Sequence, residues 1–395
     1  MSGPWLAIRM RKMQSICAIE GVKAAGIKEG KYGLALIEAE GTAAAAFTMN
    51  KASAAPIILM RERMKKGYLT ATITNSGCAN ALTGKQGISD AMEMAVIAGE
   101  YLGVEPETVG VASTGVISRY LNLPLIRDQC SRISPTLTHS ADAEITAARA
   151  IMTTDLTEKH ALVERDGFVI GGICKGSGMI APNMGTMLGY VYTDAEISQQ
   201  DLQGALKSAV RRSFNRVVVD GDTSTNDVVF LTATGAAGKV PKDEFARALE
   251  ECCTILGKQI AKDGEGATKM IEVVVRNALT EDDADLIART IVGSPLVKTA
   301  VYGEDPNWGR IIAAAGRSGA EIDPEIVSCW IENRNIRAQV CDRGTIAADL
   351  SQAKAALSGG EVRIELDLAL GKEHATAWGC DLTEKYVEIN GKYTT

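Results

Sequence analysis

Histidine is scarce in this chain: only His139, His160 and His374 occur among its 395 residues. Zinc hydrolases and Ser-His-Asp enzymes need histidine beside their other ligands or triad partners. The shortage therefore disfavours both classes. A catalytic threonine at a chain N-terminus would need no histidine, because its own α-amine can act as the base.

Other absences exclude further classes of protein. None of the nine cysteines forms a C-x-x-C pair, and we predict reduced, mostly buried thiols in a cytoplasmic protein rather than a zinc or dithiol site. No stretch approaches 18 uninterrupted apolar residues, so no membrane span is expected. The net charge is −7 and no Lys/Arg-rich run stands out, so we expect no nucleic-acid partner.

The composition that is present is ordinary for a globular protein, with 46% hydrophobic and 23% charged residues. A chain of 395 residues is long enough for two or three domain-sized units. The start, MSGPWLAIRMRKM, is basic but has no apolar core segment, so it is not typical of a signal peptide. We interpret residues 1–12 as an extension from an upstream start, without a role of their own.

Strand-like and helix-like runs alternate along the chain, which predicts a layered α/β fold. Apolar residues at helical spacing predict helices at 88–102, 141–153, 201–214 and 243–262. Apolar runs bounded by turn residues predict strands at 32–38, 69–74, 109–112, 168–174, 187–193, 217–220, 228–234, 269–276, 328–331 and 362–368.

The segment KGSGMIAPNMGTMLGYVYTDA, residues 175–195, contains the main candidate for chemistry. Thr186 directly follows Gly185 and precedes an apolar run, and its hydroxyl could attack the peptide bond before it. After such a cut Thr186 would carry both the nucleophile and, in its α-amine of pKa about 7.7–8.0, the base. From local composition alone, a threonine that merely packs in a strand remains the alternative.

This segment resembles the self-cleavage site of the ornithine acetyltransferase family, also called glutamate N-acetyltransferase. The resemblance covers residues 13–395. The family more often has alanine before the threonine, but Gly185 tolerates strained backbone angles and should permit cleavage. Further segments match the family in the same order: GTAAAAFTMNKASAAP, TNSGCANALTG, ASTGVIS, AIMTTD, GEGATK, VYGEDPNWGRI and INGKYTT.

The resemblance implies an architecture as well as a nucleophile. It implies an α/β sandwich related to the DmpA-type aminopeptidases, cut between Gly185 and Thr186 into an α chain of residues 1–185 and a β chain of residues 186–395 that share one core. Thr114 and Gly115 match the oxyanion hole of the family, where a hydroxyl and a backbone N–H would stabilise a tetrahedral oxyanion. Taken alone, Ser-Thr-Gly is more typical of an ordinary turn after a strand than of an oxyanion hole.

The resemblance also implies a substrate site. Lys175 would hold an α-carboxylate as a point charge, and Glu265 would pair with an ornithine ammonium. From the residues alone, each of these two could equally be a solvated charge. The remaining matched ligand positions are Thr153 or Thr154, Thr186 itself, and the C-terminal pair Asn390 and Thr395.

The implied reaction is transfer of acetyl from N2-acetyl-L-ornithine to L-glutamate in arginine biosynthesis, with acetyl resting on Thr186 between two half-reactions. No metal and no organic cofactor is implied, and acetyl-CoA stays open as a co-substrate. The resemblance further implies a heterotetramer of two α and two β chains. Two alternatives remain: an N-terminal-nucleophile aminopeptidase or amidase of the same architecture, and a non-catalytic binding protein that stays one chain.

Overall fold

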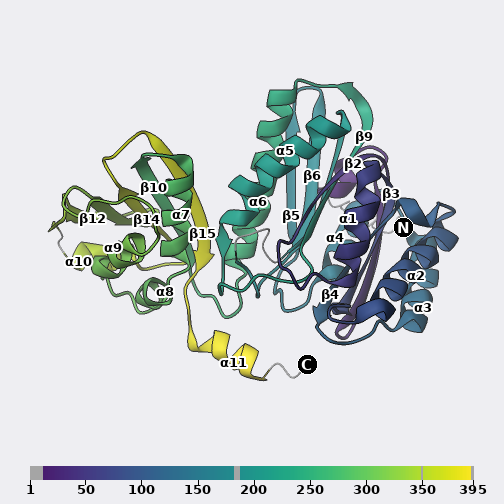
Figure 1. Ribbon diagram of the computed structural model, residues 1–395, viewed down its shortest axis with the longest axis horizontal. Helices are drawn as coiled ribbons and strands as arrows, with labels where there is room; N and C mark the ends of the chain where they lie inside the picture. The colour runs from purple at the N-terminus through teal and green to yellow at the C-terminus, as the bar shows by residue number, and fades with distance from the viewer. Residues whose placement is uncertain (1–11, 182–186, 348–349, 393–395) are drawn as a thin grey trace, which may run out of the picture.

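The computed structural model describes residues 12–181, 187–347 and 350–392. These residues form two lobes, each built on its own β-sheet (Figure 1). The fold is a layered α/β sandwich: the alternating runs predict the layered α/β class, and the family resemblance implies the sandwich. Two predicted site positions, the 185/186 junction and Thr395, lie outside the described residues.

The larger sheet has the spatial order β4-β3-β2-β9-β7-β6-β5, with β1 beside β2. Neighbouring strands are antiparallel except for the parallel pairs β3–β4 and β7–β9. Its strands are β1 (Lys23–Glu29), β2 (Tyr32–Phe47), β3 (Tyr68–Cys78), β4 (Val109–Val116), β5 (Lys159–Arg165), β6 (Phe168–Lys175), β7 (Leu188–Glu196) and β9 (Val228–Lys239).

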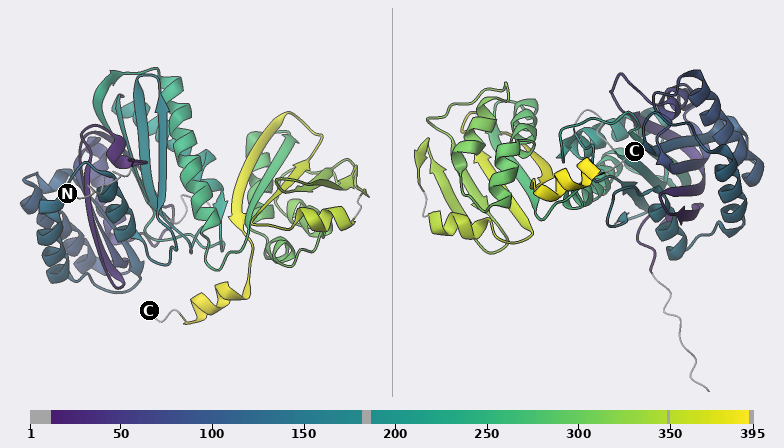
Figure 2. Two further views of the ribbon diagram at one scale, coloured as in Figure 1. Left: turned by 180° about the vertical axis from the view of Figure 1, so that it is seen from behind. Right: turned by 90° about the horizontal axis from the view of Figure 1, so that it is seen from below.

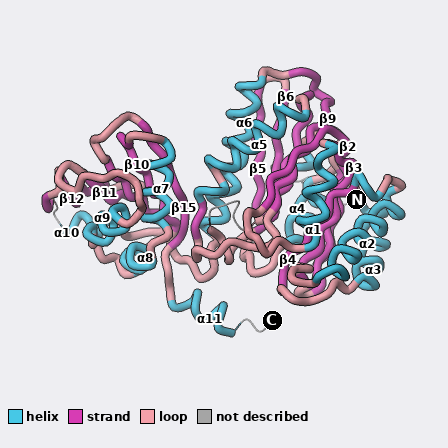
Figure 3. Tube along the Cα trace, in the orientation of Figure 1, coloured by secondary structure: helices cyan, strands magenta, loops and turns pink. Residues whose placement is uncertain are grey.

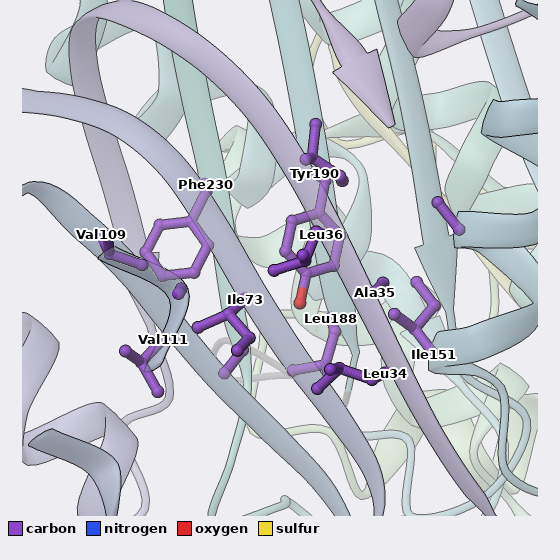
Figure 4. Packing of buried hydrophobic residues seen from close by; sticks show 14 of the residues in the cluster. Leu34, Ala35, Leu36, Ile73, Val109, Val111, Ile151, Leu188, Tyr190 and Phe230 are labelled. Atoms are coloured by element: carbon purple, nitrogen blue, oxygen red, sulfur yellow. The ribbon is translucent and has the colours of Figure 1, made fainter. Parts of the chain in front are cut away.

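The central strands β7 and β9 are nearly continuous apolar runs because both faces of this sheet are covered. Tyr190 of β7 and Phe230 of β9 pack in one hydrophobic cluster, and their rings lie 6.1 Å apart (Figure 4). Their strand neighbours Val191 and Val229 pack in a different cluster. Successive side chains of a strand point to opposite faces, so each strand contributes to both layers.

Helices cover the two faces of the larger sheet separately. The cluster with Tyr190 includes buried residues of α1 (Ala55–Arg63), α2 (Gly84–Leu102), α3 (Leu123–Ile133) and α4 (Ala141–Ile151). The cluster with Val191 includes buried residues of α5 (Gln199–Arg212) and α6 (Lys242–Lys262). The sheet is therefore the middle layer between two groups of helices.

The smaller sheet has the order β13-β12-β11-β14-β10-β15-β8 and a hydrophobic cluster of its own. Its strands are β8 (Val217–Val218), β10 (Met270–Ala278), β11 (Ser328–Glu332), β12 (Arg337–Asp342), β13 (Thr345–Ile346), β14 (Glu361–Asp367) and β15 (Glu373–Cys380). The helices of this lobe are α7 (Glu281–Val292), α8 (Pro295–Tyr302), α9 (Trp308–Gly316) and α10 (Leu350–Ala356).

Two helices join the lobes. The long amphipathic helix α6 packs on β5 and β6 of the larger sheet and also contacts β15 of the smaller one. The last helix, α11 (Glu384–Lys392), lies at the base of the molecule between the lobes (Figures 1 and 2). Figure 3 shows loops gathered at this same end, below the strands. This end of the larger sheet holds the candidate site.

Many predicted elements are confirmed. The strands predicted at 168–174 and 228–234 are β6 and the start of β9, and the helix predicted at 243–262 is α6. The strand predicted at 32–38 is much longer, because β2 continues to Phe47. All nine cysteines are free and buried, as predicted. None of the helices within the described residues is long and apolar enough to span a bilayer.

The described strands on either side of the predicted cleavage position lie in one sheet. β6 ends at Lys175 and β7 begins at Leu188, and these two residues face each other in an antiparallel pair. On its other side β7 pairs with β9, which in turn pairs with β2. The predicted α and β chains thus interleave in the larger sheet.

Candidate active site

A pocket of about 350 Å³ lies where several strands of the larger sheet end. It is open to solvent at one side, and a volume of this size suits a small ligand. It brings together every predicted site residue that the structure describes: Thr114, Gly115, Thr153, Thr154, Lys175, Glu265 and Asn390. These residues come from positions almost 280 apart in the chain, which local sequence patterns cannot place together.

Thr114 and Gly115 lie near the end of β4, beside the end of the parallel strand β3. Gly115 has φ +125°, and a Cβ there would lie 2.6 Å from Cys78 N, so only glycine fits. The two strand ends therefore approach more closely than side chains would allow. This close approach places Thr114 and Gly115 on the pocket wall.

Lys175 is the last residue of β6 and only 6% exposed. Among the described residues, no hydrogen-bond or ion-pair partner binds its ammonium. Lys175 lies near enough to Asp155 to lower the pKa of that carboxyl group, but its N–H donors have no acceptor among the described residues. An anion in the pocket would supply acceptors for them.

A carboxylate and the C-terminal helix also line the pocket. Glu265 lies against the turn after β6, because a Cβ on Gly178 would be 2.5 Å from Glu265 Oε2. Asn390 of α11 donates from Nδ2 to the same oxygen over 2.8 Å. The pocket therefore presents Lys175 and Glu265, one charge of each sign, which suits a small ligand with both a carboxylate and an ammonium.

The Thr153–Thr154 loop rests on a buried ionic network. Asp155 Oδ2 accepts from Thr153 N over 3.1 Å, and Asp155 Oδ1 accepts from Gly176 N over 2.6 Å. Lys159, fully buried, donates to Asp155 Oδ1 over 2.8 Å and to Asp263 Oδ2 over 2.6 Å. The network connects the loop with the turn after β6 and with the end of α6.

The charges of this network explain the pKa of Asp155. Burial alone would raise the pKa of this carboxyl group, but the nearby ammonium groups of Lys175 and Lys159 outweigh burial and hold it well below its usual range. The same carboxylates raise the pKa of the Lys159 ammonium against the opposing effect of its burial. Asp155 and Lys159 thus form a charged pair at neutral pH.

Three polar lining residues are not among the predicted site residues: Ser224, Thr225 and Asn226. They belong to GDTSTND, a segment that the sequence suggests only as a turn between two strands. Its density of hydroxyl and amide side chains was the available signal. Asn226 Nδ2 donates to Ala79 O over 2.6 Å and to Ser113 O over 2.8 Å, so this loop touches the strand that carries Thr114.

The ArgJ family model matches residues 19–395, nearly the whole described fold and all of the pocket. The chain belongs to the ArgJ family. Among curated relatives, this ArgJ-family chain is 52% identical over 388 residues to the glutamate N-acetyltransferase of Methanosarcina mazei, which covers 96% of this chain and 98% of that protein.

The chain is also similar to two further proteins. The arginine biosynthesis bifunctional protein ArgJ of Archaeoglobus fulgidus is 45% identical over 386 residues, covering 96% of this chain and all of that protein. The crystal structure of the ArgJ protein of Bacillus halodurans is 44% identical and has a TM-score of 0.48, covering 51% of this chain and 96% of that one.

The histidines of this ArgJ-family chain lie away from the pocket lining. His160 Nδ1 lies 2.9 Å from Ser15 Oγ, and burial lowers the pKa of its imidazole. His139 Nδ1 lies 3.0 Å from Val22 O. Within the described parts of the chain, no group of His, Cys, Asp and Glu is arranged to hold a metal ion.

Proposed function

We propose that this chain is a glutamate N-acetyltransferase of arginine biosynthesis, which transfers acetyl from N2-acetyl-L-ornithine to L-glutamate. The names of the curated relatives support this assignment. The observation that carries it is the pocket, which combines Lys175, Glu265 and the Thr114–Gly115 strand end. Lys175 would bind the α-carboxylate of acetylornithine and Glu265 its side-chain ammonium. The Thr114–Gly115 strand end would bind the acetyl carbonyl.

The proposed route begins with maturation. The Thr186 hydroxyl attacks the Gly185 carbonyl, the acyl group shifts from nitrogen to oxygen, and water hydrolyses the resulting ester. The products are chains of residues 1–185 and 186–395, and Thr186 gains a free α-amine. That amine then takes the proton of its own hydroxyl when the hydroxyl attacks a substrate.

Two half-reactions follow. Thr186 Oγ1 attacks the acetyl carbonyl of acetylornithine, and the tetrahedral oxyanion is stabilised by the Thr114 hydroxyl and the Gly115 N–H. The C–N bond breaks, ornithine leaves with the proton, and acetyl remains on Thr186. The amine of glutamate then attacks this ester through the same oxyanion site and releases N-acetylglutamate and the free hydroxyl. Each step needs only groups of this chain and its substrates.

Mass spectrometry and initial rates together test the proposal. The purified protein should contain a fragment that begins at Thr186, and acetylornithine alone should add one acetyl group to it. Rates against acetylornithine at several glutamate concentrations should give parallel lines. The Thr186→Ala variant should remain one inactive chain of 395 residues. An uncut wild-type chain with full activity, or intersecting lines with no acetylated fragment, would refute this mechanism.

The same preparation tests the remaining parts of the proposal. Acetyl-CoA in place of acetylornithine shows whether a second donor is accepted, and a peptide amide in place of both substrates tests the aminopeptidase alternative. Native mass spectrometry tests the expected assembly of two α and two β chains. Hydrolysis of the amide without acetyl transfer would replace the transferase by an amidase.

A further inference from the structure

Asn226 makes an unusual pair of hydrogen bonds at the pocket. It lies two residues before β9 and is 6% exposed. Its Nδ2 donates to the main-chain oxygens of Ala79 and Ser113, and its Oδ1 accepts from Thr225 Oγ1 over 2.7 Å. One side chain thus connects the chain beyond β3 with β4.

The chemistry of the partners fixes the orientation of this amide. Main-chain carbonyl oxygens can only accept, so the NH₂ group must face Ala79 O and Ser113 O. Both hydrogens of the NH₂ group are used in these two bonds. Asn226 therefore has no donor left for a substrate oxyanion, although it lines the same pocket as Thr114.

Hydrogen bonds hold the end of β4 on both sides of the predicted oxyanion hole. The carbonyl of Ser113 belongs to the same planar peptide as the N–H of Thr114, so fixing that oxygen fixes the plane before Thr114. On the other side, Ala79 N donates to Val116 O over 2.9 Å. Asn226 thus holds the peptide before Thr114, and Ala79 holds the carbonyl of Val116, one residue beyond Gly115. The segment Thr114–Gly115 includes a glycine, whose backbone is the least restricted of all residues.

We propose that Asn226 is a positioning residue for acetyl transfer: it aims the Thr114 hydroxyl and the Gly115 N–H at the developing oxyanion. The inference rests on the proposed function and adds a residue to its site. It also couples the two proposed fragments, because Asn226 belongs to residues 186–395 and the hole belongs to residues 1–185. An oxyanion hole needs donors at a precise distance, so a loosened strand end lowers the rate without removing a donor.

Asn226→Ala tests this inference in the cut, assembled enzyme. We expect kcat per cleaved chain to fall roughly 10–100-fold, less than the 10²–10³-fold typical for losing a donor outright. KM for acetylornithine should stay within a few-fold of the wild-type value. The oxyanion hole acts in the transition states of both half-reactions and not in ground-state binding of the substrate. In a Thr114→Ala background, Asn226→Ala should lower kcat by a clearly smaller factor, because both substitutions affect the same oxyanion hole.

Asn50→Ala is the matched control. Asn50 Nδ2 donates to Thr223 O over 2.7 Å, so it holds the same loop by the same kind of bond, and none of its hydrogen bonds to the described residues reaches β4. This variant should keep the wild-type kcat. If Asn226→Ala fails to fold, Thr225→Val removes only the bond to Oδ1, and a several-fold loss of kcat at unchanged KM is expected.

The outcomes separate the inference from the function on which it rests. A wild-type enzyme that transfers no acetyl group overturns the proposed function. With an active wild type, an unchanged kcat in Asn226→Ala overturns the inference. Equal losses in Asn226→Ala and Asn50→Ala, or losses of Asn226→Ala and Thr114→Ala that simply multiply, also overturn it, because they indicate a general effect on the fold.

Discussion

Replacing Lys159 by methionine should destabilise this protein far more than replacing an exposed lysine. The Lys159 ammonium is completely buried and donates to two carboxylates, those of Asp155 and Asp263, which are 0% and 7% exposed. Methionine has a similar length and no charge, so the variant leaves Asp263 buried without its ion-pair partner and leaves Asp155 with only the nearby Lys175 ammonium. Removing one partner of a buried ion pair typically costs about 3–5 kcal/mol.

The hydrogen bonds that the two aspartates keep in the Lys159→Met variant indicate where in this range the loss of stability should fall. Asp155 keeps the N–H groups of Thr153 and Gly176, and Asp263 keeps those of Leu156 and Thr157. Because each carboxylate retains two donors, we expect a loss in the free energy of unfolding near the lower end, about 3 kcal/mol.

Urea unfolding followed by fluorescence, at one fixed protein concentration, measures this loss. Lys65→Met is the matched control: Lys65 donates to Glu62 over 2.6 Å, but both side chains are about 70% exposed, and such a pair contributes at most about 1 kcal/mol. Equal unfolding midpoints for the two variants would refute the reasoning. Replacing Asp263 by asparagine in the Lys159→Met variant should restore much of the loss, because the buried carboxylate that lost its ion-pair partner becomes a neutral amide.

Three further predictions concern the pocket. Thr114→Ala should lower kcat by roughly 10²–10³-fold at nearly constant KM for acetylornithine, and a rise in KM alone would contradict its place in the hole. Gly115→Ala should cost about 1–3 kcal/mol in urea unfolding and slow turnover, because alanine at φ +125° is strained and its Cβ would meet Cys78 N. The pKa of Asp155 is depressed, so its stabilisation is complete above the unfolded pKa of about 3.9 and is lost as pH falls below it. The stability difference between wild type and Asp155→Asn should therefore shrink in acid, and a difference independent of pH would contradict the charged network.

Local patterns in the sequence predict the strands and helices well where packing follows the pattern. The helix at 243–262 is amphipathic and matches α6 within one residue. The second half of β2, GTAAAAF, is mostly alanine, which has no strand preference, and it forms a strand because β9 pairs with it. Tertiary pairing of this kind cannot be read from a local pattern.

The residues of the candidate site also differ in whether the sequence predicts them. Similarity to a family identified the pocket residues that touch a ligand in the proposal, such as Lys175 and Glu265. It did not identify the residues that hold the surrounding backbone and loops in place, such as Asn226 and Lys159. These act through partners more than 100 positions away, Ser113 and Asp263, and only the fold brings such pairs together. A buried lysine and an exposed lysine look alike in a sequence, although their energetic roles differ.

The interleaved strand order of the larger sheet constrains the order in which folding and the proposed cleavage can occur. Strands β9 and β7, which follow the proposed break, lie between β2 and β6, which precede it. Once the chain is cut, the first fragment has no strands between β2 and β6, and the second supplies only the β9–β7 pair that fills this gap. An unfolded mature enzyme could recover only by a bimolecular insertion of one fragment into the other. Folding must therefore come before cutting. Heat should inactivate the cut enzyme irreversibly, at conditions from which the single-chain Thr186→Ala variant still refolds.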